Sequence, residues 1–247
     1  MARKIFVVTA AYGRDPIAAM GGQAALIPII AAAGADGVEI RRELLDSVHS
    51  DALTSLADVI AAYGLAACYS APEPLCLDDG QLNPSLPALL REAQQLNAAW
   101  LKLSLGHYVT AQSLTALQPW LADGNVRLVV ENDQTPYGRL TPVARFNADC
   151  QALNLPLRLT FDMANWLWVG ESPEEAAIRL ASGIDYIHVK AAKQSEHGWR
   201  AIALDEAPPR WHELLQLLPT DAPRGIEFPL EGNDLIAVTR HYVNLLR

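Results

Sequence analysis

The chain has 247 residues, of which 51% are hydrophobic and 19% are charged, the balance of a globular protein with one substantial core. Its formal net charge is −9 and it has no long run of Lys and Arg, which argues against nucleic acid as a partner because phosphate binding depends on cationic contacts. No apolar run approaches the ~18 residues that would cross a membrane, so we expect no membrane partner either.

The amino-terminal segment is apolar but short, and Arg14 follows it closely. This pattern favours a first β-strand over a signal peptide. The three cysteines, Cys68, Cys76 and Cys150, are odd in number and not in CxxC spacing. We therefore expect reduced thiols in a cytoplasmic protein.

Short apolar or β-branched runs alternate with longer helical patterns along the whole chain. Strands are predicted at residues 4–10, Gly37–Arg41, 64–70, 100–105, 126–131, 156–162, 185–190 and 224–228. Eight strand-plus-helix repeats predict an α/β fold, a (β/α)8 TIM barrel in which residues 1–247 form a single domain. A doubly wound open sheet is the alternative, but no Gly-rich phosphate loop follows any of these strands.

Residues typical of helix ends lie between the strands. The segment 172–175, Ser-Pro-Glu-Glu, predicts an N-cap followed by Pro in the first turn and a Glu placed for a capping box. Gly183 is expected to end that helix in the left-handed conformation, and Gly64 to end an earlier one. Asn83, followed by Pro, predicts the start of another helix.

Two connections are longer than a minimal barrel needs, one from residue 71 to about 82 and one from 191 to about 209. Each follows a predicted strand. We therefore expect both to lie on the face where barrel enzymes build their active sites.

Four predicted strands end in a residue that can bind a hard divalent cation: Glu131, Asp162, His188 and Glu227. Singly, each is more often a helix cap, a salt-bridge partner or a hydrogen-bonded core residue. Together, at equivalent ends of the fifth to eighth strands, they can converge on one point, and carboxylates so placed repel one another unless a cation neutralises them. Three carboxylates and one imidazole predict a site for Mn²⁺ first, with Mg²⁺ or Co²⁺ as alternatives.

The residues around these positions resemble the sugar phosphate isomerase/epimerase family, which has a xylose-isomerase-like TIM barrel and includes ketose 3-epimerases and inosose dehydratases. The motifs that carry the resemblance are Val130-Glu131-Asn132, Phe161-Asp162-Met163-Ala164-Asn165, Ile187-His188-Val189-Lys190 and Gly225-Ile226-Glu227, preceded by Gly37-Val38-Glu39-Ile40. They follow the family's order Glu, Asp, His, Glu, and the resemblance covers essentially the whole chain.

The resemblance implies a metal-dependent isomerase or epimerase of a small sugar, keto sugar or sugar acid in carbohydrate metabolism. In the ketose epimerases, two metal-bound glutamates on opposite faces of the substrate move a proton next to the carbonyl, through an enediolate that the metal stabilises. By their matching positions, Glu131 and Glu227 are the expected catalytic residues, and Asp162 and His188 are expected to be ligands only. The resemblance also implies a homodimer or homotetramer.

Four further residues are candidates for substrate binding: Lys190, Glu39, His107 and Asn165. Lys190 lies two residues after His188, so strand alternation places both on one side, where Lys190 could bind substrate or pair with a ligand carboxylate. Glu39 and His107 could line the pocket or join a buried polar network. Asn165 could orient a metal ligand or cap the following turn.

Two departures from the ketose epimerases leave the substrate open. Gln194 stands where those enzymes carry an arginine, and Tyr137 stands where they carry an acid. A sugar-acid or keto-acid derivative therefore has equal weight with a free ketohexose. An inosose-type dehydratase is an alternative function, because its reaction begins with the same proton abstraction.

A DNA-repair enzyme of the endonuclease IV type shares the barrel but needs several zinc ions and many histidines. This chain has six histidines, of which His197, His212 and His241 fall in a predicted loop or on predicted helices. Asn165 stands where that family carries a second ligand histidine. A non-catalytic binding barrel is the remaining alternative, and the presence of both glutamates argues against it.

Overall fold

The computed structural model describes residues 3–121 and 126–247 and contains a closed barrel of eight parallel strands. The barrel strands are β1 (Ile5–Val8), β2 (Gly37–Arg41), β3 (Ala66–Cys76), β4 (Ala98–Gly106), β5 (Arg127–Glu131), β6 (Leu157–Asp162), β7 (Ile184–Val189) and β10 (Arg224–Ile226). Around the barrel they follow the order β1-β10-β7-β6-β5-β4-β3-β2. Each of the eight predicted strands overlaps one of these barrel strands, so the (β/α)8 prediction is confirmed.

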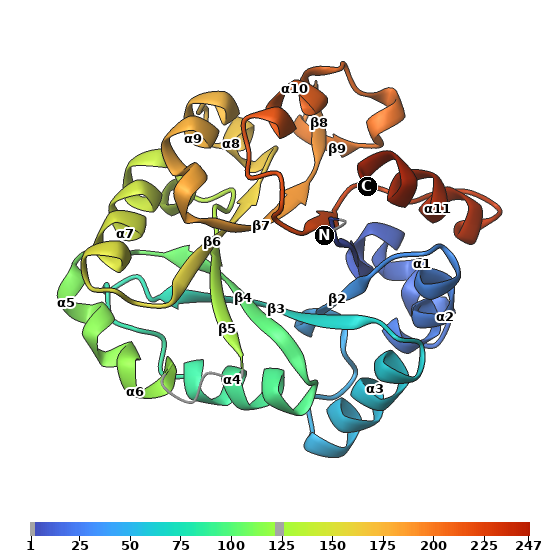
Figure 1. Ribbon diagram of the computed structural model, residues 1–247, viewed down its shortest axis with the longest axis horizontal. Helices are drawn as coiled ribbons and strands as arrows, with labels where there is room; N and C mark the ends of the chain where they lie inside the picture. Colours follow the sequence, from blue (N-terminus) through green and yellow to red (C-terminus); the bar gives the residue numbers. More distant parts are fainter. Residues whose placement is uncertain (1–2, 122–125) are drawn as a thin grey trace.

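Helices follow the strands and surround the barrel (Figure 1). They are α1 (Arg14–Ala19), α2 (Ile27–Ala32), α3 (Ser50–Ala62), α4 (Leu86–Gln95), α5 (Ala111–Leu114), α6 (Gln118–Leu121), α7 (Leu140–Ala152), α8 (Asn165–Trp168), α9 (Pro173–Leu180), α10 (Arg210–Gln216) and α11 (Leu235–Leu246). Short 3₁₀ turns are η1 (Thr9–Tyr12), η2 (Gln23–Leu26), η3 (Arg42–Leu44), η4 (Thr115–Leu117), η5 (Pro136–Gly138), η6 (Ala181–Gly183) and η7 (Leu204–Glu206).

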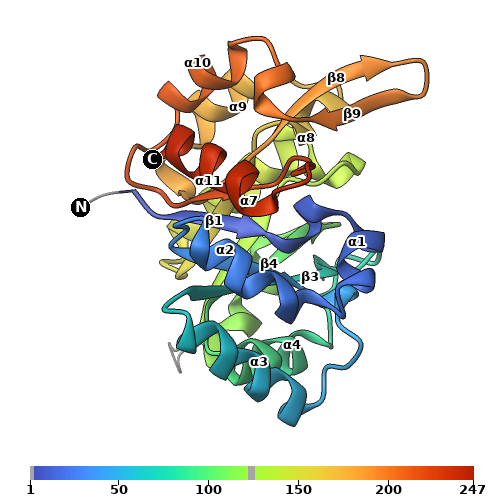
Figure 2. The ribbon, with the colours of Figure 1, turned by 90° about the vertical axis from the view of Figure 1, so that its right-hand side faces the viewer.

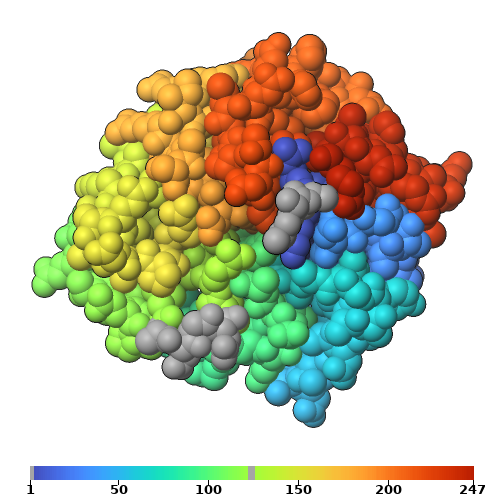
Figure 3. Space-filling view, in the orientation of Figure 1, coloured from blue at the N-terminus to red at the C-terminus, as the bar shows by residue number. Residues whose placement is uncertain are grey.

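The main core lies between these helices and the outward side chains of the strands, because the longer helices bury apolar side chains against the barrel. The last helix packs beside the first part of the chain: α11 lies next to α2 (Figure 3), where Arg240 Nη2 donates to the Ala32 carbonyl at 2.7 Å. None of the described helices combines the length and the apolar character that a membrane crossing needs.

The predicted helix ends are partly confirmed. Ser172 Oγ accepts a hydrogen bond from the Glu175 amide at 3.3 Å at the start of α9, and Gly64 has φ +70 after α3. The reason given for Gly183 is wrong, because Gly183 is not left-handed. A Cβ at Gly183 would lie 2.1 Å from Asn147 Oδ1, so a close approach to α7 requires the glycine.

The helix start predicted at Asn83 is displaced. α4 begins at Leu86 with Ser85 as its N-cap residue. Asn83 Oδ1 instead accepts from the Ser85 amide at 2.9 Å, so its side chain shapes the turn that leads into the helix.

The second long connection lies beyond the carboxyl end of its strand, but the first is shorter than predicted. Residues 71–76 belong to β3, which pairs with β4 through Pro74 and Cys76. In the second, β8 (Ala191–Ser195) and β9 (Gly198–Ile202) form an antiparallel hairpin. Figure 2 shows this hairpin extending from the side of the molecule opposite the amino terminus, which is the side of the barrel's carboxyl-terminal face.

An apolar layer fills part of the barrel interior, separate from the main core. It consists of Phe6, Cys68, Trp100, Val129 and Tyr186. The Trp100 ring centroid lies 4.9 Å from that of Phe6 and 5.1 Å from that of Tyr186. Because side chains alternate along a strand, the next inward positions stand two residues further on, so this layer supports whatever side chains lie there.

The packing of this layer depends on Gly37 on β2. A Cβ at Gly37 would lie 2.2 Å from the ring of Phe6, so Gly37→Ala should overpack the barrel. We expect it to lower the free energy of unfolding by about 1–3 kcal/mol, measured by urea denaturation. Adding Phe6→Leu should recover part of the loss, and an unchanged stability in Gly37→Ala would contradict the tight packing.

Candidate metal centre

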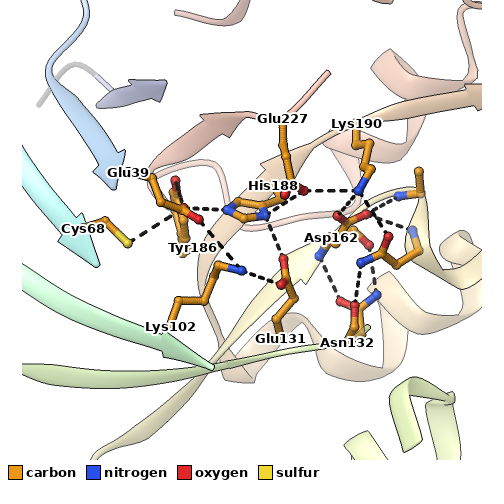
Figure 4. Close-up of polar contacts among 12 residues, drawn as sticks. Glu39, Cys68, Lys102, Glu131, Asn132, Asp162, Tyr186, His188, Lys190 and Glu227 are labelled. Carbon is orange, nitrogen blue, oxygen red and sulfur yellow. Dashed lines mark hydrogen bonds and ion pairs between the residues drawn. The ribbon is translucent and has the colours of Figure 1, made fainter. Parts of the chain in front are cut away.

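The four predicted ligand residues converge at the carboxyl ends of β5, β6, β7 and β10 (Figure 4). One ligand atom from each of Glu131, Asp162, His188 and Glu227 lies within 4.8 Å of the others. The four strands are neighbours in the barrel, and Asp162 pairs in register with His188. Asp162 and His188 are fully buried, whereas the glutamate side chains are 12% and 15% exposed. The glutamates therefore form the accessible side of the cluster.

Two of these residues have one polar atom occupied by a deeper partner. His188 Nε2 lies 2.7 Å from Glu39 Oε2, and since a carboxylate only accepts, Nε2 carries the proton and Nδ1 is left facing the cluster. Glu131 Oε2 accepts from Lys102 Nζ at 2.5 Å, which leaves Oε1 facing the cluster.

In Asp162 and Glu227 too, one carboxylate oxygen is held by a partner and the other faces the cluster. Asp162 Oδ1 accepts from the amides of Ala164 and Asn165, both at 2.8 Å, which leaves Oδ2. Glu227 Oε1 accepts from Arg41 Nη1 at 3.1 Å, which leaves Oε2. The cluster thus presents four atoms inward: Glu131 Oε1, Asp162 Oδ2, His188 Nδ1 and Glu227 Oε2.

This donor set fits a divalent cation. His188 Nδ1 lies 2.7 Å from Glu131 Oε1 and 3.0 Å from Glu227 Oε2. His188 Nδ1 and Glu131 Oε1 are buried atoms whose contact is a close ion pair without hydrogen-bond geometry. A cation between these atoms would bind both. Three carboxylate oxygens and one imidazole nitrogen are ligands typical of Mn²⁺, Mg²⁺ or Co²⁺.

Burial and neighbouring charges shift the pKa values of the four residues in different directions. Burial raises the pKa of Asp162 to about 7, although Lys190 opposes the shift. Burial would also raise the pKa of Glu131, but Lys102 and His188 outweigh it and hold the value at about 2. The pKa of Glu227 lies well below its ordinary value because Lys190 and His188 outweigh burial. Burial lowers the pKa of His188, but the carboxylates of Glu39, Glu227 and Glu131 raise it well above its ordinary value. Both cluster glutamates are therefore ionised at neutral pH.

Sequence reasoning missed the two cations that hold the glutamates. Lys102 lies inside the apolar strand β4, and its side chain is 3% exposed. A lysine inside a barrel strand is itself an indication of a buried partner, because Lys is almost never buried unpaired. Arg41 stands two residues after Glu39 on β2, which places both on the inward side. These positions could have been found by applying the alternation rule to β2 and β4.

Of the secondary candidates, Glu39 and Asn165 lie beneath or beside the cluster. Glu39 is fully buried and also accepts from Tyr186 Oη at 3.0 Å, so it belongs to a polar network that meets His188 on the side away from Asp162 (Figure 4). Asn165 donates its amide to Asp162 and its Nδ2 to the Asn132 carbonyl at 2.9 Å. The Glu39 side chain therefore orients His188 and the Asn165 backbone amide orients Asp162, and a contact of either residue with substrate stays a prediction.

The remaining two candidates are placed differently. Lys190 Nζ lies 3.2 Å from Asp162 Oδ2 and 3.3 Å from Glu227 Oε2, inside the cluster. His107 makes its contacts elsewhere. Its Nδ1 lies 2.6 Å from the Asp78 carbonyl oxygen, and its ring stacks on Tyr137.

Two cavities adjoin the cluster. One of about 420 Å³ includes Glu227 in its wall, and another of about 320 Å³ includes Lys190. The β8–β9 hairpin contributes Ala201 to the first cavity and Trp199 to the second. Both walls are largely apolar, the type of lining that encloses small molecules in enzymes.

A scan against models of protein families finds no match to this sequence, and a search of curated proteins finds none. Solved structures match over nearly the whole chain. A xylose isomerase domain containing protein from Salmonella typhimurium LT2 has 14% identity and a TM-score of 0.70 over 99% of this chain and 97% of that one. A probable 3-DHS dehydratase from Bacillus anthracis has 14% identity and a TM-score of 0.70 over 98% of both chains.

D-psicose 3-epimerase from Clostridium cellulolyticum H10, solved with D-tagatose, has 12% identity and a TM-score of 0.66 over 99% of this chain and 98% of that one. At these identities the similarity is one of architecture. The fold is therefore the xylose-isomerase-like (β/α)8 barrel, as the sequence predicts.

Proposed function

We propose that this protein is a divalent-metal-dependent enzyme that isomerises or epimerises a small sugar, keto sugar or sugar acid by proton transfer at a carbon next to a carbonyl. The observation that carries the proposal is the set of four inward-facing atoms on the carboxyl-terminal face, two of them from glutamates. Structures of the same fold that are described as a D-psicose 3-epimerase and a xylose isomerase domain protein support it.

Mn²⁺ held by Glu131, Asp162, His188 and Glu227 would supply a Lewis acid beside the substrate carbonyl. The proton transfers belong to the two glutamates. Glu131 ends β5 and Glu227 follows β10, with β6 and β7 between them, so their carboxylates approach the cluster from different sides. Lys102 holds Glu131 Oε2 and Arg41 holds Glu227 Oε1, which fixes the orientation of both proton-carrying carboxylates beside the cluster.

Solvent exchange tests this proposal. The protein would be incubated in D₂O with a panel of ketoses and keto sugar acids, in the presence of Mn²⁺ or of a chelator. We expect deuterium to enter at the carbon next to the carbonyl of at least one compound, and only with the metal, as read by NMR. Exchange with none of the compounds, or equal exchange with the chelator, would contradict the proposed reaction.

A dehydratase is the second candidate function. It is favoured by the similarity to the probable 3-DHS dehydratase and by Gln194 and Tyr137, which depart from the ketose-epimerase pattern. Dehydration begins with the same proton abstraction, so the same two glutamates would serve it. Mass spectrometry of the products separates the two functions, because a dehydratase product is lighter by one water and an isomer is not.

The affinity for Mn²⁺ should depend on pH. A metal ligand must release its proton before it binds, and both Asp162 and His188 have raised pKa values, about 7 for Asp162. Protons therefore compete with the metal more strongly as the pH falls through 7. We expect the apparent affinity measured by titration calorimetry to fall at least about tenfold between pH 7.5 and pH 5.5. An affinity independent of pH over this range would show that neither residue binds the metal.

A further inference from the structure

The ammonium group of Lys190 already occupies part of the proposed metal site. Its Nζ lies 3.2 Å from Asp162 Oδ2 and 3.3 Å from Glu227 Oε2. In Figure 4 it reaches these two carboxylates from the side opposite Lys102. Lys190 is therefore bonded to two of the four residues that we assign to the metal.

The atoms that Lys190 contacts are those left for the metal. Asp162 Oδ1 is taken by the amides of Ala164 and Asn165, and Glu227 Oε1 by Arg41, so only Oδ2 and Oε2 remain. The other two inward atoms, Glu131 Oε1 and His188 Nδ1, lie 2.7 Å from each other. The lysine thus contacts one half of the donor set, and the imidazole and a glutamate contact each other in the other half.

A divalent cation on the same two oxygens would strongly repel the ammonium of Lys190, because like charges are poorly screened at a buried site. We propose that Lys190 is an exchangeable counter-ion of the metal centre, which neutralises Asp162 and Glu227 in the metal-free protein and yields both oxygens to the metal. This inference rests on the proposed metal site and adds to it a residue that regulates occupancy.

The surroundings offer Lys190 a second position. Its Nζ also lies 3.3 Å from Asn165 Oδ1 and 5.8 Å from the centroid of the Trp168 ring, a cation–π distance. Lys190 further lines the 320 Å³ cavity. A displaced ammonium keeps the amide oxygen and the aromatic face as partners, and it then points a free donor toward a ligand in that cavity.

Two opposite effects of one substitution test the counter-ion role. Lys190→Met keeps the length of the side chain and removes its charge. We expect it to bind Mn²⁺ at least about tenfold more tightly in titration calorimetry, since the competitor is gone. The same variant should unfold at a lower temperature in chelator, because Asp162 and Glu227 lose their counter-charge, and Mn²⁺ should raise its melting temperature more than that of the parent protein.

Lys193→Met is the matched control. Lys193 is 46% exposed and its Nζ lies 3.9 Å from Glu206, so its loss should change neither measurement. Lys190→Gln gives a second uncharged variant if Lys190→Met does not fold without metal. An Mn²⁺ affinity in both Lys190 variants equal to or weaker than that of the parent would overturn the counter-ion role and leave the metal site standing. Absence of Mn²⁺ binding in the parent and in the variants would overturn the metal site itself, and this inference with it.

Discussion

Replacing Glu131 with glutamine should lower the rate of metal-dependent proton exchange by about a thousandfold or more. Glutamine keeps the shape of the side chain but cannot take a proton, and general acid–base groups contribute about 10²–10⁴ to a rate. Glu131 is also one of the four proposed metal ligands, so the substitution weakens two functions at once. The measurement is deuterium incorporation at saturating Mn²⁺, using the best substrate of the panel.

Glu227→Gln should give a loss of similar size, since Glu227 is the second proton carrier. Glu206→Gln is the control, because Glu206 is 61% exposed and lies outside the cluster. Calorimetry on each variant separates loss of metal from loss of the proton carrier: saturating Mn²⁺ restores the former and not the latter. If both glutamine variants exchanged within a few-fold of the parent at saturating metal, the two-glutamate mechanism would be wrong.

The largest effect on stability is expected from Lys102→Met. The Lys102 side chain is 3% exposed, and its Nζ lies 2.5 Å from Glu131 Oε2 and 3.8 Å from Glu39 Oε1. Removing one partner of a buried ion pair leaves an uncompensated charge, which typically costs about 3–5 kcal/mol. We expect a loss of this size in the free energy of unfolding of the metal-free protein at pH 7, measured by guanidinium denaturation.

A charge-balanced variant tests the reason for that loss. Lys102→Met combined with Glu39→Gln removes one charge of each sign, so it should be more stable than Lys102→Met alone. Lys193→Met, at an exposed position, should stay within about 0.5 kcal/mol of the parent. A loss below about 1 kcal/mol in Lys102→Met would show that water or a rearranged side chain compensates Glu131 and Glu39.

Local patterns were sufficient to predict the strands. β2 matches its predicted bounds of Gly37–Arg41, and the other seven barrel strands differ from prediction mainly at their ends, the longest difference being the continuation of β3 to Cys76. The alternation of apolar and polar residues and the apolar runs typical of strands involve only residues close together in the chain. Both can therefore be read from the sequence. Where a strand ends depends on its partner: β3 is extended because Pro74 and Cys76 pair with the end of β4.

Glycine 183 shows the limit of such local rules. Its place after α9 resembles a left-handed helix end, but the glycine is required by Asn147, which is 36 residues away in the chain and packs against it. A sequence rule can recognise the residue type and still assign the wrong cause, because packing partners on another helix leave no local pattern.

The sequence by itself determined the barrel and the four residues that gather at its carboxyl-terminal face, Glu131, Asp162, His188 and Glu227. The sequence was sufficient because eight strand-plus-helix repeats form a closed barrel, and a closed barrel brings the carboxyl ends of its strands to one rim. Only the tertiary structure decided which atoms of these residues are engaged. Lys102 stands on β4, next to the strand of Glu131, whereas Arg41 and Glu39 stand on β2, which β1 separates from β10. Arg41 and Glu39 reach Glu227 and His188 only when the barrel has closed in its register. The counter-ion position of Lys190 has the same origin, because it depends on which carboxylate oxygens those partners leave free.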